Sequence, residues 1–248
     1  MFLKILLAIT VIAQFYTVPM FLKYYWPQKC KQSLMYKMIS ATLFVLSGVL
    51  AMKIADNNTS YAYLMVLGLV FGWLGDLLLH SLKDKMLHFI LGVVAFLVGH
   101  IFYIVAFYHA LKTLNPAATV FNWYEFVIIA IVVVLVSVFC VHRNAFKRKG
   151  PMVYGLIAYG VFLSEMVVKA CLYLFAEWEY GINDYMVPAI FTVAVGSLFF
   201  FLSDASLGLI LIGDEVKRKM RIFNIITYFI AQVLLALSIL FIRSQIIV

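Results

Sequence analysis

Residues 71–80 read Phe-Gly-Trp-Leu-Gly-Asp-Leu-Leu-Leu-His and place the carboxylate of Asp76 inside an apolar run long enough to cross a bilayer. A charged side chain at the centre of a membrane helix costs roughly 2.5–3.5 kcal/mol on insertion scales, so such residues are usually functional. Residues 199–207, Phe-Phe-Phe-Leu-Ser-Asp-Ala-Ser-Leu, repeat the arrangement around Asp204. We therefore expect an all-α integral membrane protein in which the two carboxylates form one intramembrane site.

The composition excludes a soluble globular domain. The chain is 66% hydrophobic and 12% charged, with a mean hydropathy of +1.05, whereas soluble domains are about 45–50% apolar and about 25% charged. The net charge of +8 would suit a nucleic-acid partner, but the bases lie in short segments between apolar runs. That placement fits the anionic surface of a membrane, so we expect membrane lipids and no nucleic acid as partners.

Eight apolar runs reach the length of about 20 residues that a membrane-spanning helix needs. The predicted spans are 2–23, 35–53, 61–81, 87–111, 124–141, 152–175, 185–212 and 222–243. The connections between them are short and leave no room for an extramembrane domain. We therefore expect residues 1–248 to form a single transmembrane domain, with any chemistry located among the helices.

The lysines and arginines predict the orientation, because cytoplasmic loops carry an excess of these bases. Most of them lie around the first, third, fifth and seventh connections: Lys23, Lys29, Lys31, Lys37, Lys83, Lys85, Arg143, Lys147, Arg148, Lys149, Lys217, Arg218, Lys219 and Arg221. Both termini are then on the non-cytoplasmic side. At 1.5 Å per residue, Asp76 and Asp204 lie in the cytoplasmic half of the membrane, where we expect one pocket open to that side.

A shift of 128 residues superposes Asp76 on Asp204 and His100 on Tyr228. Both matched segments run in the same direction through the membrane, as in a parallel repeat. This predicts a weak repeat that relates spans three and four to spans seven and eight. Chance similarity between Leu- and Phe-rich helices would also produce such a match.

The two aspartates have the chemistry of an acid–base pair. Two carboxyls that share a site of low dielectric constant do not both ionise readily, so one keeps its proton near neutral pH. The small residues beside them, Gly75 and Ser203, would let helix backbones approach closely and bring the carboxyls together. In the alternative reading, the carboxyls only hold the helices in place.

Other polar residues of the spans have two readings each. His100 either binds a phosphate, orients a carboxylate or transfers a proton, or it is a core histidine with its hydrogen bonds satisfied. Lys37 is either a boundary base with its amino group at the interface or a ligand for a lipid phosphate. His80 is read as a boundary residue, and Glu165 and Lys169 as a pair that neutralises itself across one helix turn. No regular ligand spacing indicates zinc, and we expect no metal or cofactor.

The polar residues also match a family pattern in order along the chain. The matching features are Phe71-x3-Gly75-Asp76-x2-Leu79, Phe89-x2-Gly92-x3-Phe96-x3-His100-x2-Tyr103, Gly196-x6-Ser203-Asp204 and Tyr228-x2-Ala231-Gln232. With them the sequence resembles the YhhN-like membrane proteins, the lysoplasmalogenase family. The likeness runs from Lys37 to Ser238. It departs from the pattern where the family's second span tends to read Lys-Pro, since Met38 follows Lys37 here.

The resemblance implies an intramembrane hydrolase that cleaves the vinyl-ether bond of lysoplasmalogens to a fatty aldehyde and a glycerophospho-alcohol. Asp76 and Asp204 would be catalytic, and the sequence leaves open which of them is the acid. The resemblance also implies a set of substrate-binding or supporting residues: Lys37, His100, Tyr103, Ser203, Tyr228 and Gln232. The substrate would be a lysophospholipid in a bacterial cytoplasmic membrane or the endoplasmic reticulum, and no oligomeric state follows.

A second function class fits the same residues. Intramembrane carboxylates also serve proton relays, so a proton-coupled transporter or lipid carrier is the alternative to the hydrolase. It would move its substrate across the bilayer without changing it covalently.

Overall fold

The chain folds into a bundle of long helices, seen in a computed structural model that describes residues 1–82, 86–150, 152–180, 186–213 and 218–242. The helices are α1 (Phe2–Tyr25), α2 (Lys31–Ile54), α3 (Ser60–Leu79), α4 (Met86–Leu114), α5 (Trp123–His142), α6 (Ala145–Lys149), α7 (Met152–Tyr180), α8 (Met186–Ile190), the π-helix η1 (Phe191–Val195), α9 (Gly196–Ile212) and α10 (Arg218–Ser238). Within the described residues, eight spans are long and apolar enough to cross a membrane, with α8, η1 and α9 forming one of them. The predicted all-α fold with eight spans is confirmed.

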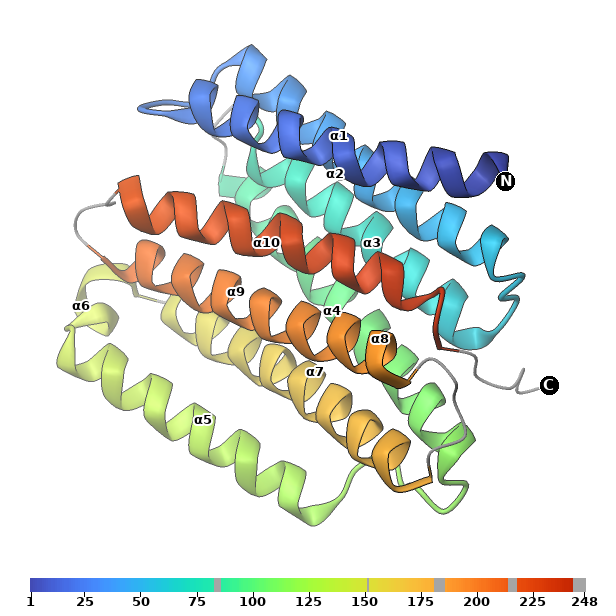
Figure 1. Ribbon diagram of the computed structural model, residues 1–248. Coiled ribbons are helices and arrows are strands. Elements are labelled where there is room, and N and C mark those ends of the chain that lie inside the picture. Colours follow the sequence, from blue (N-terminus) through green and yellow to red (C-terminus); the bar gives the residue numbers. More distant parts are fainter. Residues whose placement is uncertain (83–85, 151, 181–185, 214–217, 243–248) are drawn as a thin grey trace.

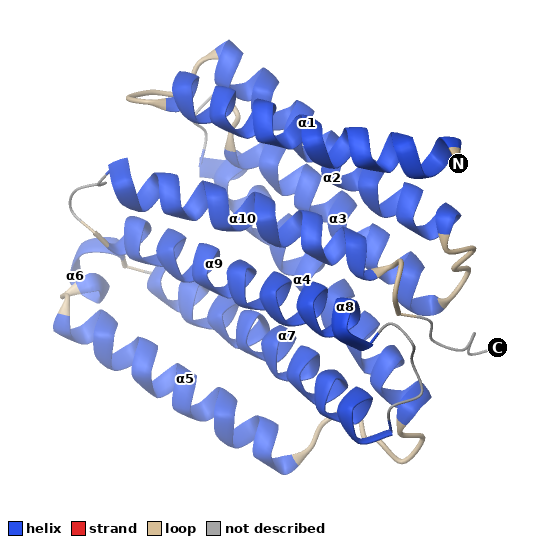
Figure 2. Cartoon of the chain, in the orientation of Figure 1, coloured by secondary structure: helices blue, strands red, loops and turns tan. Residues whose placement is uncertain are grey.

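The helices lie roughly along one common direction (Figure 1). The pair α1 and α2 forms one edge of the bundle, α5 forms the opposite edge, and the remaining long helices lie between them (Figures 1 and 2). Helix α5 packs on α7 and buries only Glu125 and Cys140. Its other side chains form an apolar outer face that suits contact with lipid.

Several helix boundaries depart from the predicted span ends, and local hydrogen bonds accompany two of these differences. Helix α2 begins at Lys31, because Cys30 and Ser33 form a reciprocal capping box at its start. Helix α10 ends at Ser238 rather than 243, where Asn57 Nδ2 donates to the carbonyl oxygens of Ile239 (2.8 Å) and Ile242 (2.6 Å). A buried asparagine from the α2–α3 connection therefore binds the carbonyl groups that follow α10.

The seventh span contains a π-helical segment, Phe191–Val195, between α8 and α9. Thr192 Oγ1 donates to the carbonyl oxygen of Pro188 at 2.8 Å, so a side chain bonds to the backbone just before this wider turn. Wide turns of this kind are rare and occur frequently at functional sites. The segment changes the helical phase of the span and so sets which face of α9 points into the bundle.

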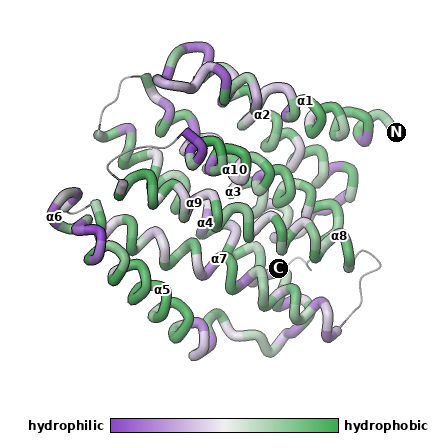
Figure 3. The backbone as a smooth tube through the Cα atoms, turned by 60° about the vertical axis from the view of Figure 1, so that its left-hand side comes forward, coloured by the Kyte–Doolittle hydropathy of each residue, from purple (hydrophilic) through white to green (hydrophobic). Residues whose placement is uncertain are grey.

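Basic residues gather at one end of the bundle, which we name the basic end. It holds the α1–α2 connection with Lys29, the α6 region with Arg143, and the start of α10 with Arg218 and Arg221. Hydrophilic stretches lie at the helix ends and around α6, and hydrophobic residues fill the middle of the helices (Figure 3). Lys83, Lys85 and Lys217 lie outside the described residues. That the basic end faces the cytoplasm stays a prediction.

Candidate active site

Asp76 lies in the last turn of α3, is 1% exposed, and has a partner on each carboxylate oxygen. Lys37 of α2 places Nζ 2.9 Å from Oδ1. Tyr228 of α10 donates its hydroxyl to Oδ2 at 2.8 Å. Three helices thus meet at one carboxylate, and a lysine ammonium neutralises its charge.

A chain of hydrogen bonds leads from α4 to Asp76. Tyr103 donates its hydroxyl to Gln232 Oε1 at 2.8 Å. Gln232 Nε2 in turn donates to the Tyr228 hydroxyl at 3.1 Å, and Tyr228 donates to Asp76. Tyr103 and Gln232 are both buried. Every donor in this chain is therefore oriented toward the carboxylate.

Glycines on α3 provide the space for this chain. A Cβ at Gly68 would lie 2.3 Å from the Tyr103 ring, and one at Gly72 would lie 2.6 Å from Gln232 Nε2. Real Cβ atoms essentially never approach other atoms this closely. The two glycines are one turn apart on the same face of the helix. They allow the polar side chains of α4 and α10 to reach the α3 backbone.

Asp204 on α9 is the centre of a second polar group, contributed by α4 and α7. Tyr159 donates its hydroxyl to Asp204 Oδ2 at 2.5 Å. His100 Nε2 lies 3.4 Å from the same oxygen. Asp204 is 9% exposed, and His100 is 1% exposed. The partners of Asp204 are thus a phenol and an imidazole, whereas Asp76 has a lysine.

The orientation of His100 follows from its other nitrogen. Nδ1 lies 2.8 Å from the carbonyl oxygen of Phe96, one turn earlier on α4. The imidazole is enclosed by the rings of Tyr159 and Phe200, whose centroids are 5.2 Å and 4.8 Å away in edge-to-face arrangements. Packing and a backbone hydrogen bond therefore fix this side chain, and it directs Nε2 at Asp204.

Aromatic rings connect the two polar groups. Phe200 packs edge-to-face against His100, the partner of Asp204, and against Tyr228, the partner of Asp76, with the second pair of centroids 5.8 Å apart. The structure brings both carboxylates into one region of the bundle, but each has its own set of hydrogen-bond partners.

The partners are exchanged between the two halves of the chain. Asp76 of the third span binds Tyr228 of the eighth, and Asp204 of the seventh span faces His100 of the fourth. Asp204 follows Asp76 by 128 residues, and Tyr228 follows His100 by the same interval. Each aspartate therefore faces the polar residue of the other half of the chain. Two repeats related by an axis would produce such contacts. The repeat itself stays a prediction.

Lys37 and Ser203 each join two helices. Lys37 of α2 directs its ammonium to Asp76 of α3. Ser203 Oγ donates to the carbonyl oxygen of Asn224 at 3.1 Å and thereby joins α9 to α10. A Cβ at Gly75 would lie 2.6 Å from the Phe96 ring. Gly75 therefore makes space for an aromatic ring that packs on Tyr228.

Tyr159 is a site residue that the sequence reasoning missed. It lies seven residues after Met152, the first residue of α7, and is half-buried. Tyrosines close to the ends of membrane spans commonly belong to the interfacial aromatic belt, so the sequence did not mark this one as a site residue. The available signal was depth, since two helical turns place Tyr159 about 10 Å into the span.

His80 lies just beyond the end of α3 and outside both polar groups. Its Nε2 is 2.8 Å from Ser33 Oγ, and its ring packs against Phe21 and Tyr25. Burial and the nearby positive charges of Lys37, Lys29 and Arg221 lower the pKa of His80 to about 3. His80 is therefore a neutral residue at physiological pH.

The predicted Glu165–Lys169 pair belongs to a larger buried group. Lys169 Nζ lies 3.4 Å from Glu165 Oε1 and makes a shorter ion pair with Glu125 of α5. It also donates to the carbonyl oxygen of Val120 at 2.6 Å. Lys169 therefore attaches α5 to α7. Across the described part of the chain, no three His, Cys, Asp or Glu side chains gather as a metal site.

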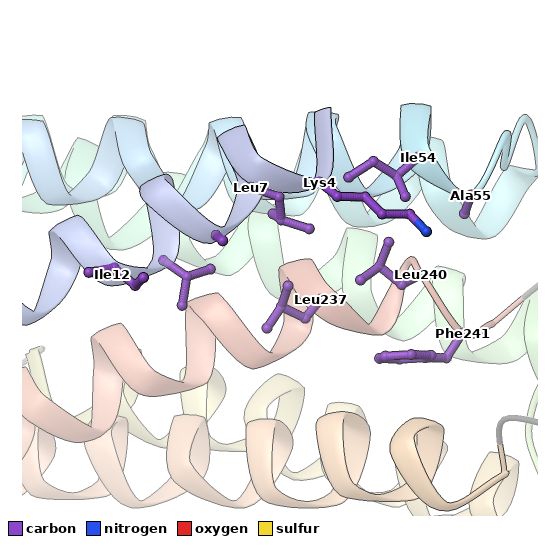
Figure 4. A pocket seen from close by; sticks show the side chains of 10 residues that line it. Lys4, Leu7, Ile12, Ile54, Ala55, Leu237, Leu240 and Phe241 are labelled. Atoms are coloured by element: carbon purple, nitrogen blue, oxygen red, sulfur yellow. The ribbon is translucent and has the colours of Figure 1, made fainter. Parts of the chain in front are cut away.

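Two cavities lie away from the carboxylates. An apolar groove of about 600 Å³ lies between the ends of α1, α2 and α10, with Lys4 extending across it (Figure 4). A second cavity of about 360 Å³ opens at the basic end, where Lys29, Ser81 and His88 are among its lining residues. Neither is lined by Asp76 or Asp204. Asp76 and Asp204 are themselves buried, with 1% and 9% of their surface exposed. The expected pocket open to the cytoplasmic side stays a prediction.

Comparison with known proteins identifies the family. No curated protein and no solved structure matches the chain. The YhhN family profile matches residues 32–239. This range includes Lys37, Asp76 and His100, as well as Tyr159 and Asp204, and thus both polar groups of the candidate site. A match over this much of the sequence shows that the chain belongs to the YhhN family.

Proposed function

We propose that this protein is an intramembrane hydrolase of the vinyl-ether bond of lysoplasmalogens. One observation carries the proposal: two buried carboxyls of one region have partners of opposite kinds, a lysine for Asp76 and a neutral phenol and imidazole for Asp204. Enzymes that need an acid and a base at the same pH separate two carboxyls in this way. Membership of the YhhN family supports the same proposal.

The reaction uses one carboxylic acid and one carboxylate. The acid transfers its proton to the alkene carbon that is not bonded to oxygen, which creates an oxocarbenium ion. The carboxylate stabilises this cation and accepts a proton from the water that attacks it, as paired carboxyls do in glycosidases. The resulting hemiacetal collapses to aldehyde and alcohol, and both carboxyls regain their starting protonation.

The depth of Asp76 suits this substrate. The vinyl-ether bond of a lysoplasmalogen lies at the head of its hydrocarbon chain, next to the glycerol and its phosphate. Asp76 lies three residues before the end of α3, which corresponds to about 5 Å along the helix. The phosphate would then lie at the basic end near Lys29, with the alkenyl chain directed between the helices.

The decisive experiment is to incubate the purified protein with a lysoplasmalogen and measure released aldehyde. We expect Asp76→Asn and Asp204→Asn each to lower the rate by about 10²–10⁴-fold, the usual contribution of a general acid or base. Glu165→Gln is the matched control, because it changes a buried carboxyl of the bundle outside the two groups. This variant should retain activity.

Substrate analogues test the chemistry itself. The 1-O-alkyl lysophospholipid lacks the alkene carbon that accepts the proton, so it should remain intact. The proposal is wrong if folded wild-type protein releases no aldehyde, or if either Asp→Asn variant keeps full activity. Loss of the folded, monodisperse state in both Asn variants would instead favour a purely structural role for the carboxyls.

A further inference from the structure

The donors and acceptors around the two carboxyls indicate which carboxyl is protonated and which is ionised. At Asp76, Oδ1 faces the Lys37 ammonium and Oδ2 accepts the Tyr228 hydroxyl. Gln232 donates to the Tyr228 oxygen, so the Tyr228 hydroxyl hydrogen is directed to the carboxylate. Both oxygens act as acceptors beside a positive charge. This arrangement favours the ionised form of Asp76.

The surroundings of Asp204, in contrast, favour a protonated carboxyl. The carbonyl oxygen of Phe96 can only accept, so the His100 Nδ1 that lies 2.8 Å from it carries hydrogen. In a neutral imidazole the other nitrogen is then an acceptor. His100 Nε2 has no hydrogen-bond partner in the described structure, and it lies 3.4 Å from Asp204 Oδ2. Two acceptors face each other unless one further proton lies between them.

We propose that Asp204 holds this proton and is the general acid, and that Asp76 is the ionised carboxylate that stabilises the cation and activates water. The inference rests on the proposed function and assigns the two roles that the sequence leaves open. His100 and Tyr159 are positioning residues: His100 faces the acidic proton through Nε2, and Tyr159 fixes Oδ2 through its hydroxyl at 2.5 Å.

Charge favours the proton on Asp204 over His100. The imidazole is 1% exposed and surrounded by aromatic rings, so a charge on it would be poorly solvated. Phe200 packs against a partner of each carboxyl, so Asp204 lies in the same region of the bundle as Asp76, where a second negative charge is disfavoured. Among the described residues, no lysine or arginine forms an ion pair with Asp204.

The assignment fixes the direction of each proton transfer. Asp204 gives its proton to the alkene carbon, and Asp76 takes one from the attacking water. During collapse of the hemiacetal, its hydroxyl proton returns to Asp204, and the proton on Asp76 goes to the oxygen of the departing alcohol. Both carboxyls end as they began. The sum is one water consumed and one C–O bond broken for each aldehyde released.

Infrared difference spectroscopy of the substrate-free protein tests the assignment. A protonated carboxyl has a C=O stretching band well separated from the carboxylate bands. We expect the wild-type minus Asp204→Asn spectrum to contain this band. The wild-type minus Asp76→Asn spectrum should contain the carboxylate bands of the ionised Asp76. Tyr159→Phe should keep the Asp204 band but shift its frequency, because the carboxyl loses one hydrogen bond.

The same measurements in a Glu165→Gln background remove the contribution of another buried carboxyl. An unchanged C=O region in Asp204→Asn would overturn the assignment. The spectra need no substrate, so they test the assignment of acid and base independently of the proposed hydrolysis. Aldehyde release with a protonated Asp76 contradicts only the roles, whereas a protonated Asp204 without aldehyde release contradicts only the reaction.

Discussion

At the scale of single residues, the molecule contains ionised groups that the membrane interior disfavours, and it accommodates them by pairing. Lys37 and Asp76 are both largely buried and lie 2.9 Å apart. A buried pair of this kind adds little stability over apolar residues, but removal of one partner leaves an uncompensated charge. The proposed role of Asp76 as an ionised carboxylate would explain why this pair is present.

This account predicts the outcome of a double-variant experiment on Lys37 and Asp76. Lys37→Met should lower the free energy of unfolding in detergent by about 3–5 kcal/mol, because the carboxylate remains buried without its partner. Lys37→Met combined with Asp76→Asn should recover most of this loss but remain inactive. The control is Lys53→Met, an exposed lysine of the same helix, which should change stability by less than about 0.5 kcal/mol. Equal stability of Lys37→Met and Lys53→Met would contradict the account.

At the scale of the helices, the site depends on close approach along α3. Gly68 and Gly72 receive the Tyr103 ring and the Gln232 amide, which are parts of the hydrogen-bond chain that ends on Asp76. Small residues at helix contacts allow such approach in membranes, where apolar burial between helices supplies little driving force. The packing of α3 and the electrostatics of Asp76 are therefore coupled.

This coupling predicts opposite effects for two matched substitutions. Gly68→Ala should destabilise the protein by about 1–3 kcal/mol, the usual cost of overpacking, and should lower activity by displacing Tyr103. Gly155→Ala on α7 has nothing within 4 Å of the new Cβ and should be neutral or stabilising by up to about 1 kcal/mol. Thermal unfolding and aldehyde release of the two variants provide the comparison. Normal activity and stability in Gly68→Ala would show that α3 is not so constrained.

At the scale of the whole molecule, the basic end determines where a lipid headgroup could bind. The bases of the α1–α2 connection, the α6 region and the start of α10 gather there, and the cavity with Lys29 and His88 opens at the same end. An excess of lysine and arginine favours the cytoplasmic side of a membrane. The candidate site would then receive lipid from the cytoplasmic leaflet.

Cysteine labelling of the two ends tests this orientation. In a variant without Cys30, Cys140 and Cys171, we would introduce Asn144→Cys at the basic end or Asn58→Cys at the opposite end, both exposed positions. An impermeant maleimide added to intact cells should label Asn58→Cys and leave Asn144→Cys unmodified until the membrane is opened. The reverse pattern would place the candidate site in the outer half of the membrane.

The sequence by itself determined the membrane class, the eight spans and the two costly carboxyls, because length, hydropathy and buried charge are local properties of the chain. It also singled out Lys37, His100, Tyr103, Tyr228 and Gln232, all of which lie in the two polar groups.

Only the tertiary structure decided which residues are partners. The sequence predicts that Asp76 and Asp204 form one site but does not predict their contacts. In the structure, Asp76 pairs with Lys37, whereas Asp204 contacts Tyr159 and His100. Hydropathy reports how deep a residue lies but not how its helix is rotated about its axis. That rotation depends on packing between helices and on the π-helical segment before α9. Contacts between residues up to 152 positions apart therefore decided the candidate chemistry of Asp76 and Asp204.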